Sequence, residues 1–104
     1  MERISILIAD DHPMVRMGIK NLLETQKNFS VVGEASDGEE ALREIERTRP
    51  MIAILDISMP KLNGIKTAKI VAKKFPETKV VVLTMYEDEA YMGKAMEAGA
   101  HGYL

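Results

Sequence analysis

Three aspartates and one threonine follow short apolar runs of this 104-residue chain, and their residue types suit phosphate and metal chemistry. They are Asp10 and Asp11 after the first run, Asp56 at the end of the third, and Thr84 after the fourth. If the three acids lie close together, a bound cation relieves their mutual repulsion. Mg²⁺ takes carboxylate oxygens together with water and phosphate oxygens. A carboxylate beside that cation can attack phosphorus and form an aspartyl phosphate.

Four apolar runs predict the strands that would position these side chains. The runs cover residues 4–9, 29–35, 51–55 and 80–83, and a fifth begins at Gly102. Three of them are nearly continuous and rich in β-branched residues, as strands buried on both faces are. We therefore expect a parallel sheet.

Helical periodicity separates these runs. Pro13 suits the first turn of a first helix, and Ser36 with Glu39 has the spacing of a capping box for a second. Gly99 is expected to close a fourth segment, which opens with the acids at 87–89. A third helix is indicated by an apolar stripe of Ile65, Ala68, Ala72 and Phe75.

Alternation of strand and helix with short links predicts one α/β domain, an open doubly wound parallel sheet with helices on both faces. Ligands of such sheets bind beyond the carboxyl ends of the strands, where the strand order reverses. Asp10, Asp11 and Asp56 are therefore expected to meet at one rim of the sheet.

Composition excludes several other kinds of protein. The chain has no cysteine, which excludes disulfides, thiolate metal sites and cysteine nucleophiles. Fourteen basic and sixteen acidic residues give a net charge of −2, which excludes the overall basic footprint of a nucleic-acid binder. No apolar run approaches a membrane span, and the first residues do not begin a signal peptide. We expect a cytoplasmic protein without membrane contact.

Four blocks of sequence carry a resemblance that extends over the whole chain. They are Ile8-Ala9-Asp10-Asp11-His12, Leu55-Asp56-Ile57-Ser58-Met59-Pro60 with Gly64, Leu83-Thr84, and Ala98-Gly99-Ala100-His101-Gly102-Tyr103-Leu104. Together they resemble the receiver domain of bacterial two-component response regulators. The first and last blocks are similar to the class whose receivers precede a LuxR-type helix-turn-helix domain. This resemblance implies a flavodoxin-like fold over residues 1–104, with strand order 2-1-3-4-5.

The resemblance also implies a role for each matching residue. Asp56 is the phosphoacceptor and a metal ligand, Asp10 and Asp11 hold Mg²⁺, and the backbone carbonyl of Ser58 is a further ligand. Thr84 is the hydroxyl that reorients toward the phosphoryl group, and Tyr103 is the aromatic switch that follows it. His12 is interpreted from the residues alone as a solvated helix cap rather than a ligand.

The implied partner is a sensor histidine kinase, and the implied output is a DNA-binding domain of a parent protein, absent from this chain. The chain is expected to assist its own phosphotransfer and dephosphorylation without being an enzyme that turns over a separate substrate. Receivers of this family continue into a lysine two residues beyond the match to Leu104 and then into a fifth helix. We therefore expect a truncated receiver, with about 400 Å² of uncovered apolar surface worth about 10 kcal/mol. A homodimer or a swapped oligomer would cover that surface.

Three other functions remain open at this point. A phosphohydrolase of the dehalogenase type would need a second acid two residues after its nucleophile, whereas Asp10 and Asp11 are adjacent. A flavin mononucleotide module would need a phosphate loop rich in Ser, Thr and Gly after the first strand. An interaction domain that works without phosphorylation is the third alternative.

Overall fold

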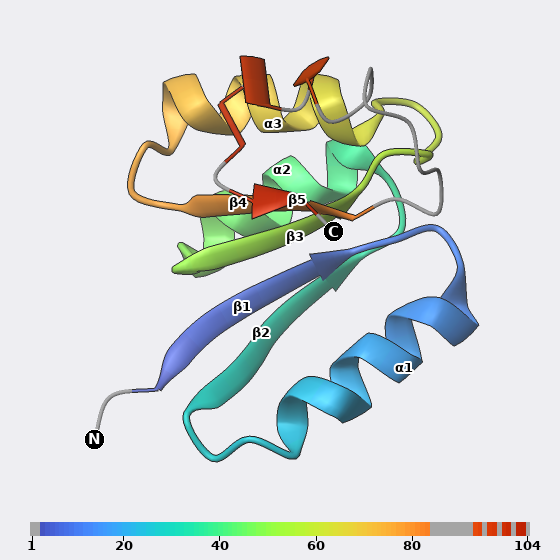
Figure 1. Cartoon of the computed structure of the whole chain (residues 1–104), viewed down its shortest axis with the longest axis vertical. Coiled ribbons are helices and arrows are strands. Elements are labelled where there is room, and N and C mark those ends of the chain that lie inside the picture. Colours follow the sequence, from blue (N-terminus) through green and yellow to red (C-terminus); the bar gives the residue numbers. More distant parts are fainter. Residues whose placement is uncertain (1–2, 84–92, 95, 98, 101, 104) are drawn as a thin grey trace.

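The computed structural model describes residues 3–83, 93–94, 96–97, 99–100 and 102–103, in which strands and helices alternate (Figure 1). The elements are β1 (Ile4–Ala9), α1 (Pro13–Glu24), β2 (Phe29–Ala35), α2 (Gly38–Thr48), β3 (Ile52–Asp56), α3 (Gly64–Lys74), β4 (Lys79–Leu83) and β5 (Gly102–Tyr103). The first two strands have the predicted bounds. The third lies one residue further along the chain than predicted, and the fourth begins one residue earlier.

The five strands form one parallel sheet in the order β2-β1-β3-β4-β5, which confirms the predicted strand order. In the register of the central pair, Ala9 lies beside Leu55, and the neighbouring pair places Asp56 beside Leu83. The strand order reverses between β1 and β3. Because all strands run the same way, the residues after β1 and β3 lie at the same edge of the sheet, next to this reversal.

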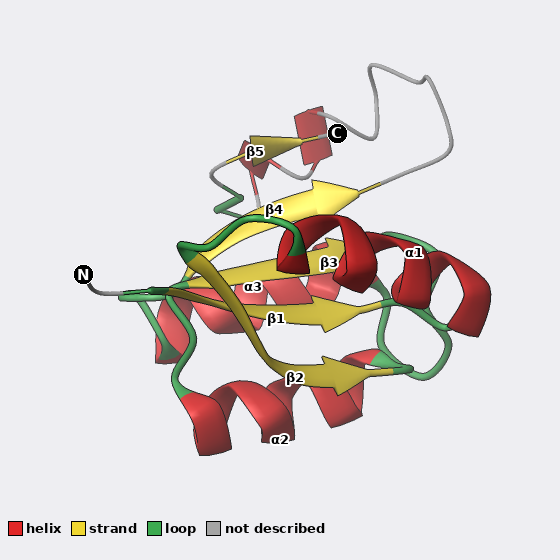
Figure 2. Ribbon diagram, turned by 90° about the horizontal axis from the view of Figure 1, so that it is seen from below, coloured by secondary structure: helices red, strands yellow, loops and turns green. Residues whose placement is uncertain are grey.

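Helices cover both faces of the sheet, as predicted: Figure 2 shows α1 on one face and α2 on the other. Helices α2 and α3 pack against each other and against the strands. The core lies on their side of the sheet and is aliphatic. It is formed by alternate strand residues with Ala41 and Ile45 of α2 and Ala68 and Val71 of α3.

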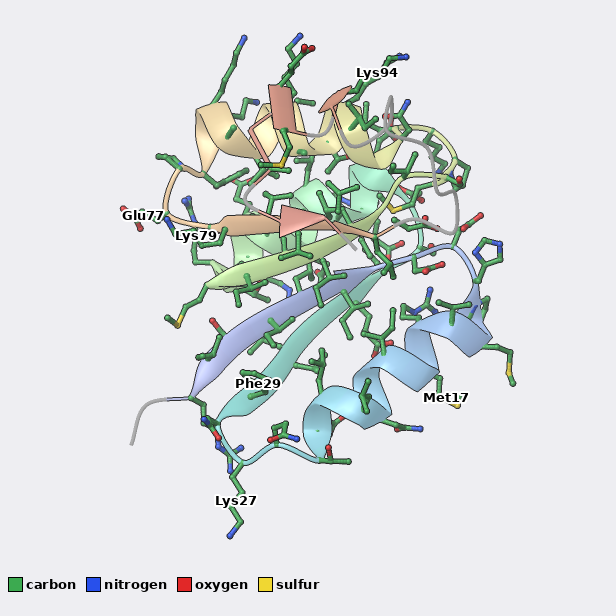
Figure 3. All side chains as sticks on the ribbon, viewed as in Figure 1. Met17, Lys27, Phe29, Glu77, Lys79 and Lys94 are labelled. Carbon is green, nitrogen blue, oxygen red and sulfur yellow. The ribbon has the colours of Figure 1, made fainter. Side chains whose placement is uncertain are left out.

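Helix α1 covers its face of the sheet without burying any of its own residues. Met14 is 80% exposed and Leu22 is 71% exposed, and Met17 points outward from the helix (Figure 3). These apolar side chains give α1 an outer surface that is exposed and partly apolar. The expected association of copies through such a surface stays a prediction.

The start of α2 differs from the predicted capping box. The helix begins at Gly38, and its N-cap is Asp37, whose carboxylate accepts a hydrogen bond from Glu40 N at 2.8 Å. Ser36 Oγ instead lies 3.4 Å from a carboxylate oxygen of Glu40. The predicted capping box of Ser36 and Glu39 was therefore wrong, because the cap lies one residue further along the chain. The extended backbone of Asp37 (φ −152°) places its carboxylate over the first turn of the helix.

Two other helix signals are confirmed. Pro13 opens α1, where its missing N–H is not needed by the helix. Gly99 has φ 102°, a left-handed conformation that glycine adopts without a Cβ clash, and its N–H donates to Met96 O. The acids predicted to open this fourth segment lie outside the described residues. Within the described ranges, no helix is both long enough and apolar enough to cross a bilayer.

Candidate functional site

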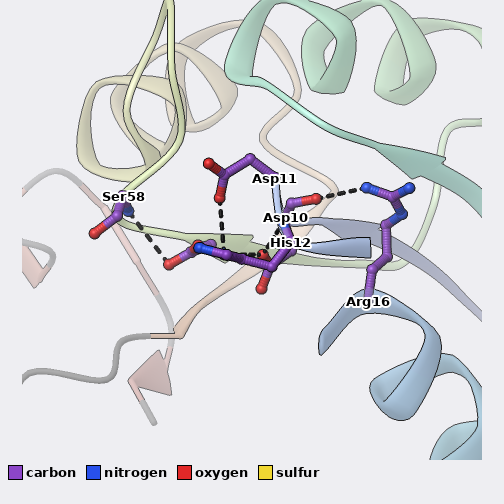
Figure 4. A network of polar contacts seen from close by, with 6 residues as sticks. Asp10, Asp11, His12, Arg16 and Ser58 are labelled. Carbon is purple, nitrogen blue, oxygen red and sulfur yellow. Dashed lines mark hydrogen bonds and ion pairs between the residues drawn. The ribbon is translucent and has the colours of Figure 1, made fainter. Parts of the chain in front are cut away.

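The carboxyl ends of β1 and β3 bring four side chains into one cluster, which we call the acidic cluster (Figure 4). Asp10, Asp11, His12 and Asp56 each offer one ligand atom, and these atoms all lie within 4.8 Å of one another. Asp10 and Asp56 are buried, while His12 is exposed. The three acids singled out in the sequence thus meet at one rim, although they come from strands separated by more than forty residues.

The loop after β3 fixes the carboxylate of Asp56. Ile57 and Met59 are buried and anchor this loop, while Ser58 between them is exposed. Ile57 N donates to Leu83 O at 3.1 Å, which ties the start of the loop to β4. Ser58 N donates to Asp56 Oδ1 at 3.2 Å (Figure 4), so one carboxylate oxygen is held by the loop. The role of the Ser58 carbonyl as a metal ligand stays a prediction.

The backbone of Asp10 is held from two sides. Its N–H donates to Ala35 O of β2 at 2.9 Å, and its carbonyl accepts from Arg16 Nη1 of α1 at 2.7 Å. Arg16 is in turn paired through Nε with Glu34 Oε1 of β2 at 3.2 Å. Sequence reasoning missed both Arg16 and Glu34. The available signal was that Arg16 lies one helical turn after His12, on the side of α1 that faces the acids.

The side chain of His12 enters the acidic cluster instead of capping α1. His12 is the N-cap residue, but its side chain makes no capping hydrogen bond. Its Nδ1 lies 3.0 Å from Asp10 Oδ1, 2.9 Å from Asp11 Oδ1 and 3.8 Å from Asp56 Oδ2. The interpretation of His12 as a solvated cap was right about its position and exposure and wrong about its contacts. The three carboxylates attract a protonated imidazole, whereas the positive partial charge at the N-terminus of α1 does not.

The charges of the cluster perturb its ionisation. Burial raises the pKa of Asp56, and the negative charges of Asp10 and Asp11 raise it further, against the opposing hydrogen bond from Ser58 N. The pKa of His12 is also raised, first by its hydrogen bond with Asp10 and then by the charge of Asp11. The Asp10 and Asp11 charges contribute to both shifts, in the direction that holds a proton in the cluster. A proton or a cation relieves the repulsion between these charges.

One carboxylate oxygen of the cluster is left without a hydrogen bond. Asp11 Oδ1 is buried and accepts no hydrogen bond from any described residue, although His12 Nδ1 is 2.9 Å away. A buried acceptor without a hydrogen bond is unfavourable, and a cation coordinated by this oxygen would add to its ion pair with His12. Hard divalent cations bind through carboxylate oxygens, so the cluster fits Mg²⁺.

The structure describes little of the two predicted switch residues. Thr84 lies outside the described residues. Tyr103 belongs to β5, where its backbone pairs with Val82 of β4, but its side chain is not among the described parts of the structure. Their predicted roles therefore stay predictions.

Comparison with known proteins places this arrangement in a family. The sequence model described as "Response regulator receiver domain" matches residues 6–104. The transcriptional regulatory protein YhcZ of Bacillus subtilis is 45% identical over 96% of this chain and 47% of its own length. The chain thus spans about half the length of the curated relatives it matches.

Solved structures give the same result for the fold. The signal receiver domain of the response regulator NarL from Mycobacterium tuberculosis matches this chain with a TM-score of 0.97 and 34% identity. The match covers 100% of this chain and 84% of the NarL chain. The isolated receiver domain of RcsB from Salmonella enterica, solved with a beryllium fluoride phosphomimetic, has a TM-score of 0.91 and 31% identity. That match covers 99% of this chain and 77% of the RcsB domain.

Proposed function

Because this chain belongs to the family of response regulator receiver domains, we propose that it accepts a phosphoryl group on Asp56 and so works as a signalling switch. The observation that supports this most directly is the acidic cluster at the strand-order reversal, with Asp56 buried beside Asp10 and Asp11. In this proposal Asp10, Asp11, Asp56 and the Ser58 carbonyl hold Mg²⁺. The Asp11 oxygen, which accepts no hydrogen bond from the described residues, is the feature of this chain that favours a cation there.

Asp56 is the nucleophile in the proposed transfer. Since Oδ1 is held by Ser58 N, we assign the attack to Oδ2, which faces the cluster. The new Oδ2–P bond forms as the P–N bond of a phosphohistidine breaks, and the histidine nitrogen leaves with its electron pair. When bound, Mg²⁺ supplies neutralisation of the phosphoryl oxygens. Burial of Asp56 keeps water from competing with the incoming group.

The partner that donates the phosphoryl group is proposed to be a sensor histidine kinase, in the cytoplasm. Thr84 and Tyr103 would carry the change from the phosphoryl group to the surface formed by the fourth predicted helix and the fifth strand. Because relatives such as YhcZ are named transcriptional regulatory proteins, we propose transcription as the regulated output, through a DNA-binding domain in the parent protein. The domain accepts one phosphoryl group and assists its loss, and no separate substrate is turned over.

The direct test is the intact mass of the protein after incubation with acetyl phosphate, with Mg²⁺ or with a chelator. We expect a gain of one phosphoryl group with Mg²⁺, none with the chelator and none in Asp56→Asn. Glu46→Gln, an exposed acid on α2, is the matched control and should gain the group as the wild type does. If neither the wild type nor a version extended past Leu104 gains mass with Mg²⁺, the phosphoacceptor function fails. The alternative of an interaction domain that works without phosphorylation would then be favoured.

A further inference from the structure

We propose that His12 is an additional ligand of the cation site and that its imidazole nitrogen extends the metals bound there from Mg²⁺ to Zn²⁺ and similar divalent ions. The inference rests on the proposed cation site of Asp10, Asp11 and Asp56. It adds to that site a nitrogen donor that oxygen ligands alone do not supply.

The distances around His12 are close to those of donor atoms that share one ion. Zinc binds imidazole nitrogen and carboxylate oxygen at about 2.0–2.2 Å, so neighbouring donors around a tetrahedral ion lie about 3.3–3.6 Å apart. His12 Nδ1 lies 3.0 Å from Asp10 Oδ1, 2.9 Å from Asp11 Oδ1 and 3.8 Å from Asp56 Oδ2. Small adjustments of these side chains would place all four atoms around one centre.

The imidazole of His12 contacts the acidic cluster, where its Nδ1 lies at hydrogen-bond distance, 3.0 Å, from Asp10 Oδ1. His12 occupies the N-cap of α1, yet the ring makes no capping bond. The backbone of His12 makes the hydrogen bonds at the start of α1. His12 O accepts from Arg16 N at 2.9 Å, and His12 N donates to Asp10 Oδ1 at 2.8 Å. These bonds fix the main chain, while 61% of the side chain remains exposed. The ring can therefore shift by the small amount that coordination requires.

The carboxylate of Asp11 supplies a further observation within the same cluster. Asp11 Oδ1 is buried and accepts no hydrogen bond from the described residues, although it forms an ion pair with His12 Nδ1 at 2.9 Å. The close contact is therefore poorly aligned for a hydrogen bond between these two atoms. An ion placed between them would be bound by both and would satisfy the Asp11 oxygen.

The chemistry of the donor atoms determines which ions bind more tightly when His12 is a ligand. Imidazole nitrogen suits zinc, copper, iron and nickel, whereas Mg²⁺ prefers oxygen. A site with three carboxylates and one imidazole therefore binds Zn²⁺ through four protein atoms, while Mg²⁺ uses mainly the oxygens. Because both ions need Asp10, Asp11 and Asp56, they compete for the site. Zn²⁺ is thus expected to displace Mg²⁺.

The test is calorimetric titration of the purified, untagged protein with ZnCl₂ and, separately, with MgCl₂. Outer-shell partners of metal ligands already contribute about 10–100-fold to affinity, so loss of a direct ligand should cost at least about tenfold. We expect His12→Ala to weaken Zn²⁺ binding by that factor and to change Mg²⁺ binding little. His101→Ala removes the other histidine of the chain and should leave both affinities unchanged.

Two further measurements separate coordination from hydrogen bonding. His12→Gln retains a hydrogen-bond donor but lacks the imidazole, and it should lose Zn²⁺ affinity as His12→Ala does. With Co²⁺ as a paramagnetic probe, proton NMR should show strongly shifted imidazole resonances that disappear in both variants. Wild-type Zn²⁺ affinity in His12→Gln, or the absence of shifted imidazole resonances, would overturn the assignment.

The outcomes also separate this inference from the proposed function. If the wild type binds both ions and His12→Ala leaves the ratio of Zn²⁺ to Mg²⁺ affinity unchanged, His12 is no ligand and the Mg²⁺ site stands. If the wild type binds Zn²⁺ through His12 but does not bind Mg²⁺, the inference stands and the Mg²⁺-dependent function fails.

Discussion

The first residue of α3 lies directly against the backbone of the proposed phosphoacceptor. A Cβ atom at Gly64 would lie 2.2 Å from the carbonyl oxygen of Asp56 and 2.8 Å from its carbonyl carbon. Gly64 N also donates to Ile57 O at 3.1 Å, which closes the loop between β3 and α3. Only a residue without a side chain allows this approach. The position of Asp56 and the start of α3 are therefore coupled through backbone atoms.

We predict that Gly64→Ala destabilises the fold by about 1–3 kcal/mol, because the clash involves backbone atoms that have no alternative rotamer. The shift of Asp56 should also slow its phosphorylation. Gly18→Ala is the matched control: a Cβ there meets nothing within 4 Å, and the position is inside α1. Alanine at that position should stabilise by about 0.5–1 kcal/mol. Urea unfolding measures both changes, and equal effects of the two substitutions would contradict the clash.

The hydrogen bond from Arg16 to the Asp10 carbonyl predicts an effect on metal affinity. Arg16→Met should weaken Mg²⁺ binding about tenfold, as loss of an outer-shell partner typically does, because Asp10 is no longer held from the side of α1. Lys20→Met is the control, since Lys20 Nζ also contacts Glu34, at 3.3 Å, but has no contact with Asp10. Calorimetry with Mg²⁺ measures the change. If both variants lose affinity equally, the effect passes through Glu34 and not through the Asp10 carbonyl.

Much of the fold could be predicted because its signals are local. The run 4–9 is apolar throughout, so the bounds of β1 follow from composition alone, and Pro13 marks the start of α1. The start of α2 could not be predicted in the same way. Ser36 and Asp37 are adjacent and both are good cap residues, so local preference does not choose between them. The extended backbone of Asp37 decides, and that conformation depends on the packed chain.

The acids of the candidate site were predictable, but their supporting contacts were not. Asp10 and Asp56 follow from the general rule that ligands bind beyond parallel strand ends. The contact of His12 with Asp56 requires β1 and β3 to lie side by side, and the partner of Arg16 is a main-chain carbonyl that carries no sequence signal. Contacts of this kind arise only when the strands are assembled.

A buried hydroxyl links the starts of β3 and β4 and gives a third prediction. Thr78 Oγ1 donates to Pro50 O at 2.8 Å, and both residues are buried. Thr78→Val keeps the shape but leaves this carbonyl without its donor, so we expect a loss of about 1–3 kcal/mol. Thr25 Oγ1 donates to Leu22 O at 2.7 Å in an exposed position, where water replaces the bond. Thr25→Val should therefore change stability by no more than about 0.5 kcal/mol. Thermal unfolding that shows equal losses would contradict the role of burial.

The cap of α2 predicts how stability depends on pH. The pKa of Asp37 is lowered, first by the hydrogen bond from Glu40 N and then by the nearby charge of Lys61. Because the folded pKa lies below the unfolded value of about 3.9, this contribution is complete above that pH and is lost as pH falls through the folded pKa.

Asp37→Asn retains an oxygen that can cap the helix but does not titrate. The stability of the wild type relative to this variant should therefore be greatest near neutral pH and shrink below about pH 4. Asp37→Ala should lose about 1 kcal/mol at neutral pH, because no cap remains. Glu46→Gln, on the exposed face of the same helix, controls for the removal of a charge. Urea unfolding at several pH values measures each difference, and a difference between wild type and Asp37→Asn that grows as pH falls would contradict the lowered pKa.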